Sequence, residues 1–389
     1  KRNELFDQIK GLESASCETV DRLLGLMRPP VNTPSTDEVR PGMYDLEIPS
    51  YGTMPPYRYL VQLPPEYDPD RKYPTIVTLH GAGSTPSMQL DWWCGSWTDN
   101  NQRFGQASRH GYIVIAPFWG EEDQGVYRFT AREHGAVLYT LRDACNRFSI
   151  DTDRVFISGH SMGGDAAWDI ALAHPDLWAG AIPIVATAGK YITRYWENAK
   201  YVPFYFVFGG VDGDRISTDA IDLDRYLKRD YNVTVVEFKG RGHEDFYEEI
   251  HNLFDWMGRY RRDFWLKEFE TVSLRPWDSF YWWVELSNMP DRAMIDPYDW
   301  ASAGNVTAAQ TSGRVTPSNQ VYVKSPASST AVYLSPKLID YKISTEVNVD
   351  NKRLTDMSGN IQGDLRTMLD DVRTRCDRQN VFWNRLIKE

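Results

Sequence analysis

The chain has 389 residues, enough for one large α/β domain and a smaller second domain. Its formal net charge of -11 argues against a nucleic-acid partner, because phosphate binding needs a basic surface. No apolar run approaches the roughly 20 residues that span a bilayer, so a membrane partner is not expected.

Residues 1–44 are predicted to form an N-terminal helical arm. Apolar residues recur at helical spacing over residues 3–28, and Pro29-Pro30 ends the pattern. The chain starts with neither Met nor a signal-like segment. If a secretion signal once preceded Lys1, a secreted or periplasmic location is favoured.

Residues 45–264 alternate between strand-like runs and helical stretches. The run 75–79 is apolar along almost its whole length, as strands buried on both faces are. Further strands are expected at residues 57–63, 112–116, 155–158, 179–185, 204–208 and 233–238, and helices at residues 130–148, 217–229 and 245–262. This alternation implies right-handed crossovers and a doubly wound, mostly parallel sheet with helices on both faces. The sequence therefore predicts an α/β domain here.

Residues 265–389 show a different pattern. Short runs with period-two alternation, separated by Gly, Pro, Ser and Asn, indicate a small antiparallel sandwich. The runs cover residues 281–286, 306–309, 320–323, 331–334 and 345–349. Residues 361–387 are rich in Arg and Asp and are predicted to form a terminal helix. We therefore expect a β-sandwich-like accessory domain that ends in a helix.

Residues 159–163 read Gly-His-Ser-Met-Gly and lie between an apolar run and a helical stretch. A G-x-S-x-G match between a strand and a helix is typical of a nucleophile elbow. Small neighbours are needed there, because the strand and the helix crowd the backbone on either side of the serine. Ser161 is therefore the candidate nucleophile.

A serine hydroxyl needs a neighbouring base, and an imidazole is suited to accepting and returning its proton. His243 follows a predicted strand and so falls on the same sheet edge as Ser161. The third member should be a carboxylate that orients the imidazole. Asp212, after the strand 204–208, is favoured by the order Ser, Asp, His, and Asp214 is the alternative.

Two backbone amides are expected to stabilise the negatively charged oxygen of the tetrahedral intermediate. One belongs to Met162, the residue after the nucleophile. The other should come from the Gly-rich loop 80–84, which lets the backbone approach a ligand closely. Ala82 is the first choice, and Gly83 is the alternative.

Aromatic residues are abundant, at 13% of the chain. Several tryptophans follow predicted strands near the proposed site, and their rings could stack on a sugar or an aromatic group of a substrate. The alternative is that they close the core beneath a long loop, residues 84–104. The candidate substrate-binding residues are Trp92, Trp93, Trp97, Trp119 and Trp196.

The four cysteines are Cys17, Cys94, Cys145 and Cys376. They form no C-x-x-C pair and have no histidine at metal spacing, so no metal site is predicted. A chain of this length does not need disulfides, and free thiols are favoured.

These motifs together resemble α/β-hydrolases of the esterase and prolyl-oligopeptidase-like group over roughly residues 45–262. The resemblance rests on the motifs at residues 79–83, 150–155, 159–164, 208–212 and 242–243. It implies a serine hydrolase that acts through an acyl-enzyme, without a cofactor, on carboxylic esters or less often on peptide bonds. The tail, with residues 334–336 and 373–378, is similar to an extra domain of some bacterial members.

No segment before residue 45 is long enough for the β-propeller of the large prolyl oligopeptidases. An esterase acting on a small-molecule or polymeric ester is therefore favoured, with acyl or feruloyl esters of polysaccharide or aromatic polyesters as candidate substrates. One alternative is a prolyl-oligopeptidase-like serine peptidase. Another is a carbohydrate-binding protein with a vestigial hydrolase domain.

Overall fold

The computed structural model of the protein describes residues 2–12, 15–32, 40–356 and 358–389. The chain divides into two compact units. The larger unit comprises Pro29–Asp263 and Pro297–Ala301, and the smaller unit comprises Lys1–Arg28, Phe264–Asp296 and Ser302–Glu389. Within the described ranges, no helix is both long enough and apolar enough to cross a membrane.

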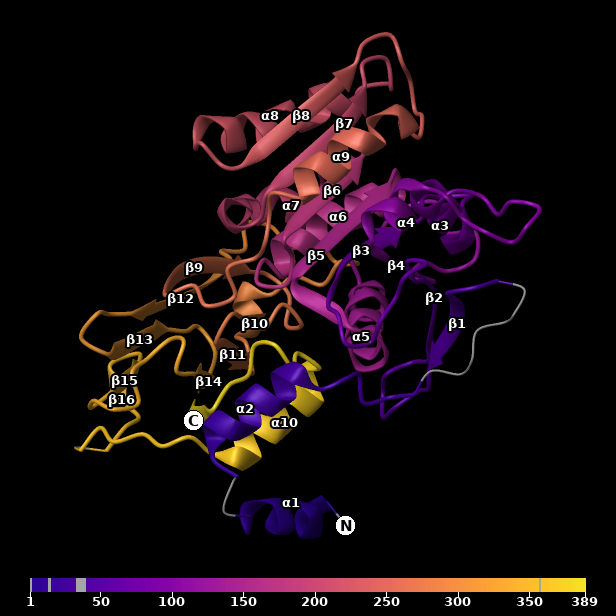
Figure 1. The fold of residues 1–389 in the computed structure, drawn as a ribbon. Helices are drawn as coiled ribbons and strands as arrows, with labels where there is room; N and C mark the ends of the chain where they lie inside the picture. The colour runs from indigo at the N-terminus through magenta and orange to yellow at the C-terminus, as the bar shows by residue number, and fades with distance from the viewer. Residues whose placement is uncertain (1, 13–14, 33–39, 357) are drawn as a thin grey trace. The chain divides into compact units, whose positions relative to one another are not determined.

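An eight-stranded sheet forms the centre of the larger unit (Figure 1). Its order is β1-β2-β4-β3-β5-β6-β7-β8, and every neighbouring pair from β4 to β8 is parallel. β2 pairs antiparallel with both β1 and β4. The strands are β1 (Met43–Ile48), β2 (Tyr57–Gln62), β3 (Tyr73–Leu79), β4 (Ile113–Pro117), β5 (Ile150–His160), β6 (Gly180–Ile184), β7 (Phe204–Gly209) and β8 (Val233–Phe238). The prediction of a doubly wound, mostly parallel sheet is confirmed.

Helices cover both faces of this sheet, and β7 shows why. Tyr205 points to one face, where its ring meets Trp256 of α9. Phe206 points to the other face, where it packs edge-on against Trp168 of α6 at 4.6 Å. Because both faces of a buried parallel strand are apolar, the whole of β7 reads as hydrophobic. The helical segments include α3 (Pro86–Cys94), α4 (Gln106–His110), α5 (Ala131–Arg147), α6 (Met162–Ala173), α7 (Tyr191–Arg194), η1 (Trp196–Tyr201), α8 (Arg215–Lys228), η2 (Tyr247–Glu249) and α9 (Ile250–Met257).

The smaller unit contains two further sheets, as the alternating pattern predicts. The expectation that they are wholly antiparallel is wrong, because β13 and β15 pair in parallel. One sheet has the order β10-β11-β14-β17, and the other has the order β16-β15-β13-β12-β9. Phe269 packs against Trp282 and Trp283 at 4.9 and 5.2 Å, so aromatic rings fill the core of the unit. The strands are β9 (Glu268–Ser273), β10 (Phe280–Tyr281), β11 (Val284–Ser287), β12 (Ala309–Val315), β13 (Gln320–Lys324), β14 (Ser329–Leu334), β15 (Glu346–Val349), β16 (Lys352–Arg353) and β17 (Asn384–Lys388), with a 3₁₀ turn η3 (Asp291–Ala293).

The helix predicted over residues 361–387 is shorter in the structure. α10 (Leu365–Arg375) ends at Cys376, which adopts the left-handed conformation with φ 62°. The end of the chain then forms β17, which pairs antiparallel with β14. A left-handed residue after the last helical turn ends a helix. The polar pattern continues beyond Cys376, which is why the predicted helix was too long.

The periodic run 3–28 forms two helices, α1 (Arg2–Lys10) and α2 (Cys17–Leu26), where one was expected. Ser16 starts the second helix, because its side chain accepts a hydrogen bond from the Thr19 amide. Leu24 of α2 belongs to a small core with Met368 of α10 and Trp383.

The segment expected as a loop over residues 84–104 contains α3. Thr85 caps the helix by accepting from the Met88 amide, and Pro86 occupies its first turn. Both features favour a helix start. Trp92 and Trp93 are therefore buried residues of a helix and not of a loop.

Candidate active site

Ser161 occupies a strained turn between β5 and α6. Its φ of 55° and ψ of -123° are rare for a residue with a side chain. The Ser161 amide donates to the Ile184 carbonyl at 2.9 Å, and the Ser161 carbonyl accepts from the Asp165 amide at 3.0 Å. These bonds fix the strained backbone between a strand and a helix, the geometry of a nucleophile elbow.

Two glycines make this turn possible. A Cβ added to Gly159 would lie 2.1 Å from the Gly163 carbonyl oxygen. A Cβ added to Gly163 would lie 2.1 Å from the Leu79 carbonyl oxygen. Real Cβ atoms do not approach backbone so closely, so the G-x-S-x-G pattern follows from steric exclusion around Ser161.

His243 and Asp212 are brought together by the loops that follow β8 and β7. His243 Nδ1 lies 2.8 Å from Asp212 Oδ2. A neutral imidazole in this arrangement donates from Nδ1 to the carboxylate and keeps Nε2 as an acceptor. The His243 side chain is 42% exposed and that of Asp212 is 12% exposed, so the histidine can be reached from solvent while its partner is shielded.

The alternative carboxylate, Asp214, has a different position. It is the exposed residue that precedes α8, and its carbonyl oxygen accepts from the Thr218 amide. The structure therefore brings Asp212, and not Asp214, to the imidazole of His243.

The loop 80–84 passes directly beside the elbow. A Cβ added to Gly81 would lie 3.2 Å from Ser161 Cβ and 2.8 Å from the His160 carbonyl oxygen. Gly83 has φ +69°, and the Ser84 amide donates to the Gly81 carbonyl, which makes a tight turn next to the serine.

The two predicted amide donors lie at this junction. Ala82 is an exposed residue of the 80–84 turn. Met162 is the first residue of α6, and the first amides of a helix have no acceptor within it. Both amides therefore belong to backbone that adjoins Ser161.

His160 connects the elbow to the loop that carries His243, a role that the sequence did not reveal. His160 Nε2 donates to the Asp245 carbonyl at 3.0 Å. His160 Nδ1 lies 3.4 Å from Gln89 Nε2 and accepts from it. Burial lowers the pKa of the His160 imidazole, which favours the neutral ring that these two bonds require.

Trp93 begins the hydrogen-bond chain that ends at His160. Its Nε1 donates to Thr78 Oγ1 at 3.1 Å, and Thr78 Oγ1 donates to Gln89 Oε1 at 2.7 Å. The Trp93 side chain is fully buried. In this structure Trp93 therefore stabilises the elbow indirectly, through Thr78, Gln89 and His160.

The other four candidate tryptophans have different surroundings. Trp92 packs edge-on against His160 at 5.0 Å, and the buried Trp119 contacts His80 of the 80–84 loop at 5.7 Å. Trp97 lies 4.5 Å from the guanidinium of Arg103, and Trp196 lies near Arg225 of α8 and Arg229, which follows α8. Trp92 and Trp119 are thus next to the site, and a substrate contact by any of the five stays a prediction.

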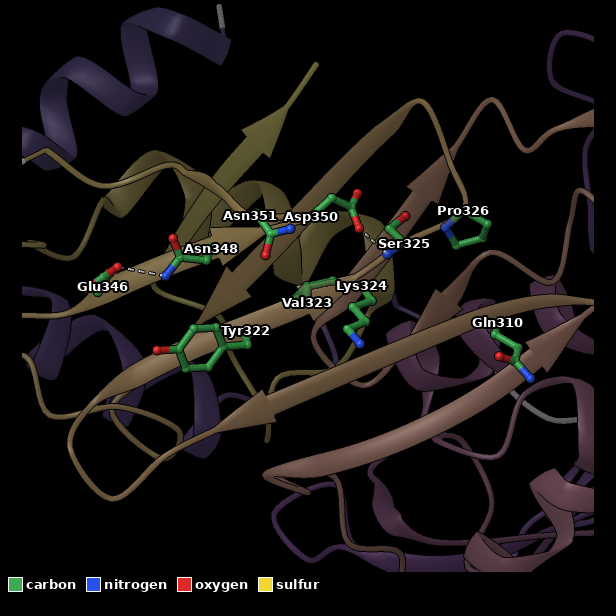
Figure 2. Close-up of a pocket in the computed structure, with 10 residues that line it drawn as sticks. All are labelled: Gln310, Tyr322, Val323, Lys324, Ser325, Pro326, Glu346, Asn348, Asp350 and Asn351. Carbon is green, nitrogen blue, oxygen red and sulfur yellow. Dashed lines mark hydrogen bonds between the residues drawn. The ribbon is translucent and has the colours of Figure 1, made fainter.

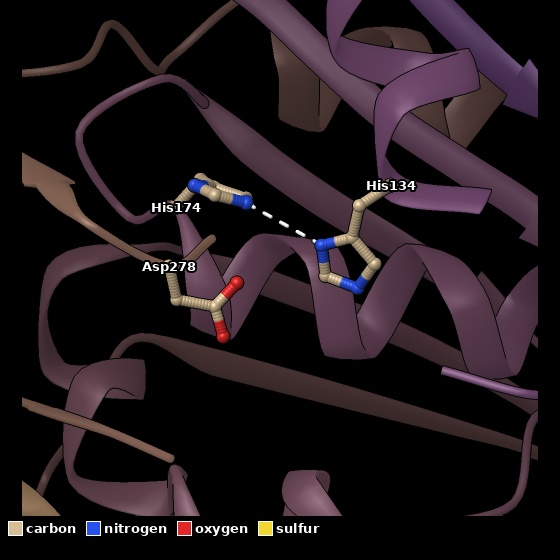
Figure 3. A group of neighbouring side chains, drawn as sticks. All are labelled: His134, His174 and Asp278. Carbon is tan, nitrogen blue, oxygen red and sulfur yellow. Dashed lines mark hydrogen bonds between the residues drawn. The ribbon is translucent and has the colours of Figure 1, made fainter. Parts of the chain in front are cut away.

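Two further histidines, His134 and His174, lie close together in the larger unit, apart from the proposed active site. His134 Nδ1 and His174 Nε2 are 3.4 Å apart and point toward one another (Figure 3). His134 Nε2 lies 3.0 Å from Asp169 Oδ2, which also accepts from the Tyr127 hydroxyl at 2.7 Å. All four side chains are buried, so these bonds satisfy polar groups inside the unit.

The chain is similar in sequence to known esterases and hydrolases. A family model described as "Putative esterase" matches residues 53–330. Cutinase 2 of Thermobifida cellulosilytica is 32% identical over 167 residues, covering 41% of this chain and 58% of the cutinase. A 2-hydroxy-6-oxononadienedioate/2-hydroxy-6-oxononatrienedioate hydrolase of Cupriavidus pinatubonensis is 33% identical over 105 residues, covering 26% of this chain and 32% of that hydrolase. The chain thus spans less than two thirds of the length of either relative.

Among solved structures, a thermostable esterase has a TM-score of 0.46 to this chain and 21% sequence identity, covering 58% of this chain and 64% of its own. The family model covers most of the chain, and its match includes the elbow, Asp212 and His243. The protein therefore belongs to this esterase family.

Proposed function

We propose that this protein is a serine esterase with Ser161 as nucleophile, His243 as base and Asp212 as the orienting carboxylate. The proposal is carried by the 2.8 Å contact between His243 Nδ1 and Asp212 Oδ2, at the sheet edge where the strained Ser161 turn lies. Family membership supports an ester as the substrate.

In the acylation step, Ser161 Oγ attacks the ester carbonyl carbon while His243 Nε2 takes the hydroxyl proton. The Met162 and Ala82 amides stabilise the resulting oxyanion. Asp212 stabilises the imidazolium that forms and keeps the ring in the tautomer with Nε2 free to act. The tetrahedral intermediate then expels the alcohol, which leaves with the proton from His243.

In the deacylation step, water replaces the alcohol. His243 removes a proton from the water, and the hydroxide attacks the acyl carbon of the Ser161 ester. The second intermediate releases the carboxylic acid, and the proton returns to Ser161 Oγ. No redox change and no cofactor are needed for this cycle.

The substrate is proposed to be a small-molecule or polymeric ester, with acyl or feruloyl esters of polysaccharide and aromatic polyesters as the finer candidates. The likeness to a cutinase supports a polymeric ester. The exposed His243 side chain supports access by a bulky chain, because the proposed base is not enclosed.

The test compares Ser161→Ala with Ser217→Ala, an exposed serine in the same unit. Ser161→Ala should lower turnover of p-nitrophenyl butyrate by at least about 1,000-fold and abolish labelling by a fluorophosphonate, while Ser217→Ala should leave both unchanged. Full turnover by folded Ser161→Ala would exclude the proposal. Faster cleavage of the matched anilide than of the ester would favour the peptidase alternative.

A second candidate function is saccharide binding by the smaller unit. A hollow of about 540 Å³ lies over β13 and β15. Figure 2 shows the side chains that line it, and one of them, Tyr322, is 43% exposed. Its polar lining includes the amides of Gln310, Asn348 and Asn351. An exposed ring with planar amides suits a neutral polyol.

Charge also favours an uncharged ligand in this hollow. Lys324 and Glu346 carry opposite charges, and Asp350 pairs with Lys388 at 2.5 Å. Affinity electrophoresis of Ser161→Ala through a gel containing feruloylated arabinoxylan should show retardation. Adding Tyr322→Ala should remove the retardation, whereas adding the exposed Tyr51→Ala should not. Equal electrophoretic mobility of the two double variants would exclude this function.

A further inference from the structure

A second strained residue lies beside the elbow, directly after β6. Val185 has φ 47°, a conformation that is unfavourable for a β-branched residue. The carbonyl of the preceding residue, Ile184, is the acceptor for the Ser161 amide. Backbone strain of this kind persists only where the surrounding contacts enforce it, and it concentrates at functional sites. Here, one residue that contacts the strained segment also contacts Asp212.

Arg215, the first residue of α8, holds this strained segment. Its Nη1 donates to the Val185 carbonyl at 3.0 Å and to Thr187 Oγ1 at 2.5 Å. Its Nε lies 3.2 Å from Asp212 Oδ2, the same oxygen that contacts His243 Nδ1. One rigid guanidinium therefore joins the segment after β6 to the carboxylate that faces the histidine.

Two carboxyl groups bind two further amides of the segment. Asp165 Oδ1 accepts from the Thr187 amide, and Asp219 Oδ1 accepts from the Ala188 amide, both at 2.7 Å. Burial raises the pKa of Asp165 to about 6 and that of Asp219 to about 7. The proximity of Asp165 and Asp222 raises the pKa of Asp219 further.

These raised pKa values affect how strongly the positive charge of Arg215 interacts with Asp212. If Asp165 and Asp219 were both fully ionised, the guanidinium would be shared among three carboxylates. Because burial raises both pKa values, the two groups are largely protonated below about pH 6, and in that range the cation is left largely to Asp212.

We propose that Arg215 is a positioning residue that locks Asp212 to the strained 185–188 segment and so fixes the orientation and charge balance of the His243–Asp212 pair. This inference rests on the proposed esterase function. Arg215 acts through Asp212 and has no direct role in the bond-making steps.

The test separates the charge of Arg215 from its geometry. Arg215→Gln should lower kcat for p-nitrophenyl butyrate by about 10- to 100-fold with little change in KM. It should also move the acid limb of the kcat/KM profile to higher pH, because loss of the cation makes protonation of His243 easier. Arg215→Lys should keep the wild-type acid limb but lower kcat, because an ammonium cannot make the same set of bonds.

Lys228→Gln is the control. Lys228 also lies on α8 and pairs with an aspartate four residues away, Asp224, at 2.6 Å, on the exposed side of the helix. Its removal should change neither kcat nor the pH profile. A wild-type kcat and acid limb in Arg215→Gln, or the same limb shift in Arg215→Lys, would overturn the inference.

Thr187→Val covers the case in which Arg215→Gln does not fold. It removes one acceptor of the guanidinium without changing any charge, so kcat should fall by about 3- to 10-fold with an unmoved acid limb. An unchanged kcat in Thr187→Val would then count against the proposed lock. Turnover retained by Ser161→Ala would instead refute the esterase function itself, so the two failures are distinguishable.

Discussion

Gly163 is one of the two glycines at which packing around the proposed nucleophile leaves no space for a side chain. A Cβ there would meet the Leu79 carbonyl oxygen at 2.1 Å, and that oxygen is fixed in the central strand β3. Gly163→Ala should therefore destabilise the fold by about 2–4 kcal/mol and displace Ser161. Urea unfolding followed by tryptophan fluorescence measures the first effect, and the rate of fluorophosphonate labelling measures the second.

Gly125→Ala provides the control, because a Cβ at Gly125 would meet nothing within 4 Å. This variant should change stability by no more than about 0.5–1 kcal/mol and leave labelling intact. Wild-type stability and labelling in Gly163→Ala would show that the elbow can relax, contrary to the steric argument.

For single residues, the sequence predicted those whose conformation depends mainly on neighbours in the chain. Ser161 and its glycines share one turn, so a five-residue pattern between a strand and a helix was sufficient to find them. His160 and Arg215 act through partners that are 85 and 30 residues away in the chain, Asp245 and Val185. A pattern in one sequence carries no signal for such pairings, and the fold was needed to reveal them.

Between secondary-structure elements, the hydrogen-bond chain from Trp93 to His160 connects α3, β3 and β5. Thr78 is fully buried at its centre, where it accepts from Trp93 and donates to Gln89. Thr78→Val keeps the shape but leaves both partners unsatisfied, which should cost about 1–3 kcal/mol. Labelling should also slow several-fold, because Gln89 would no longer orient His160.

Thr75→Val separates these two effects. Thr75 is equally buried on the same strand, but its hydroxyl bonds to the Tyr73 carbonyl, away from this chain. Thr75→Val should lower stability, measured by urea unfolding, without slowing the labelling reaction. If both variants slow labelling equally, the effect belongs to β3 in general and not to the hydrogen-bond chain.

The positions of strands were predicted well where a buried apolar run marks them. The ends of helices were predicted poorly where a capping residue or a left-handed residue sets them. Central strands such as β3 and β7 are buried along their whole length, so their apolar runs located them. α3 begins at the local signal Thr85-Pro86, which an aromatic-rich stretch obscured. α10 ends because Cys376 adopts a left-handed conformation, and that choice depends on the tertiary structure around it.

At the scale of the whole molecule, buried acids should make stability depend on pH. The pKa of Asp219 is raised by burial from 3.8 to about 7, so the folded state binds a proton that the unfolded state has lost. The resulting contribution favours folding most below about pH 4 and is lost as pH rises toward about 7. Above that range, an ionised Asp219 destabilises the fold.

Asp219→Asn tests this dependence. The amide oxygen can still accept from the Ala188 amide, and the uncharged side chain removes the burial cost near Asp165, Asp222 and Arg215. The variant should gain stability over the wild type as pH rises from about 5 to 8, by on the order of a few kcal/mol. Urea unfolding at a series of pH values measures the difference. A constant difference across that series would mean that Asp219 does not titrate in the folded state, and the raised pKa would have to be abandoned.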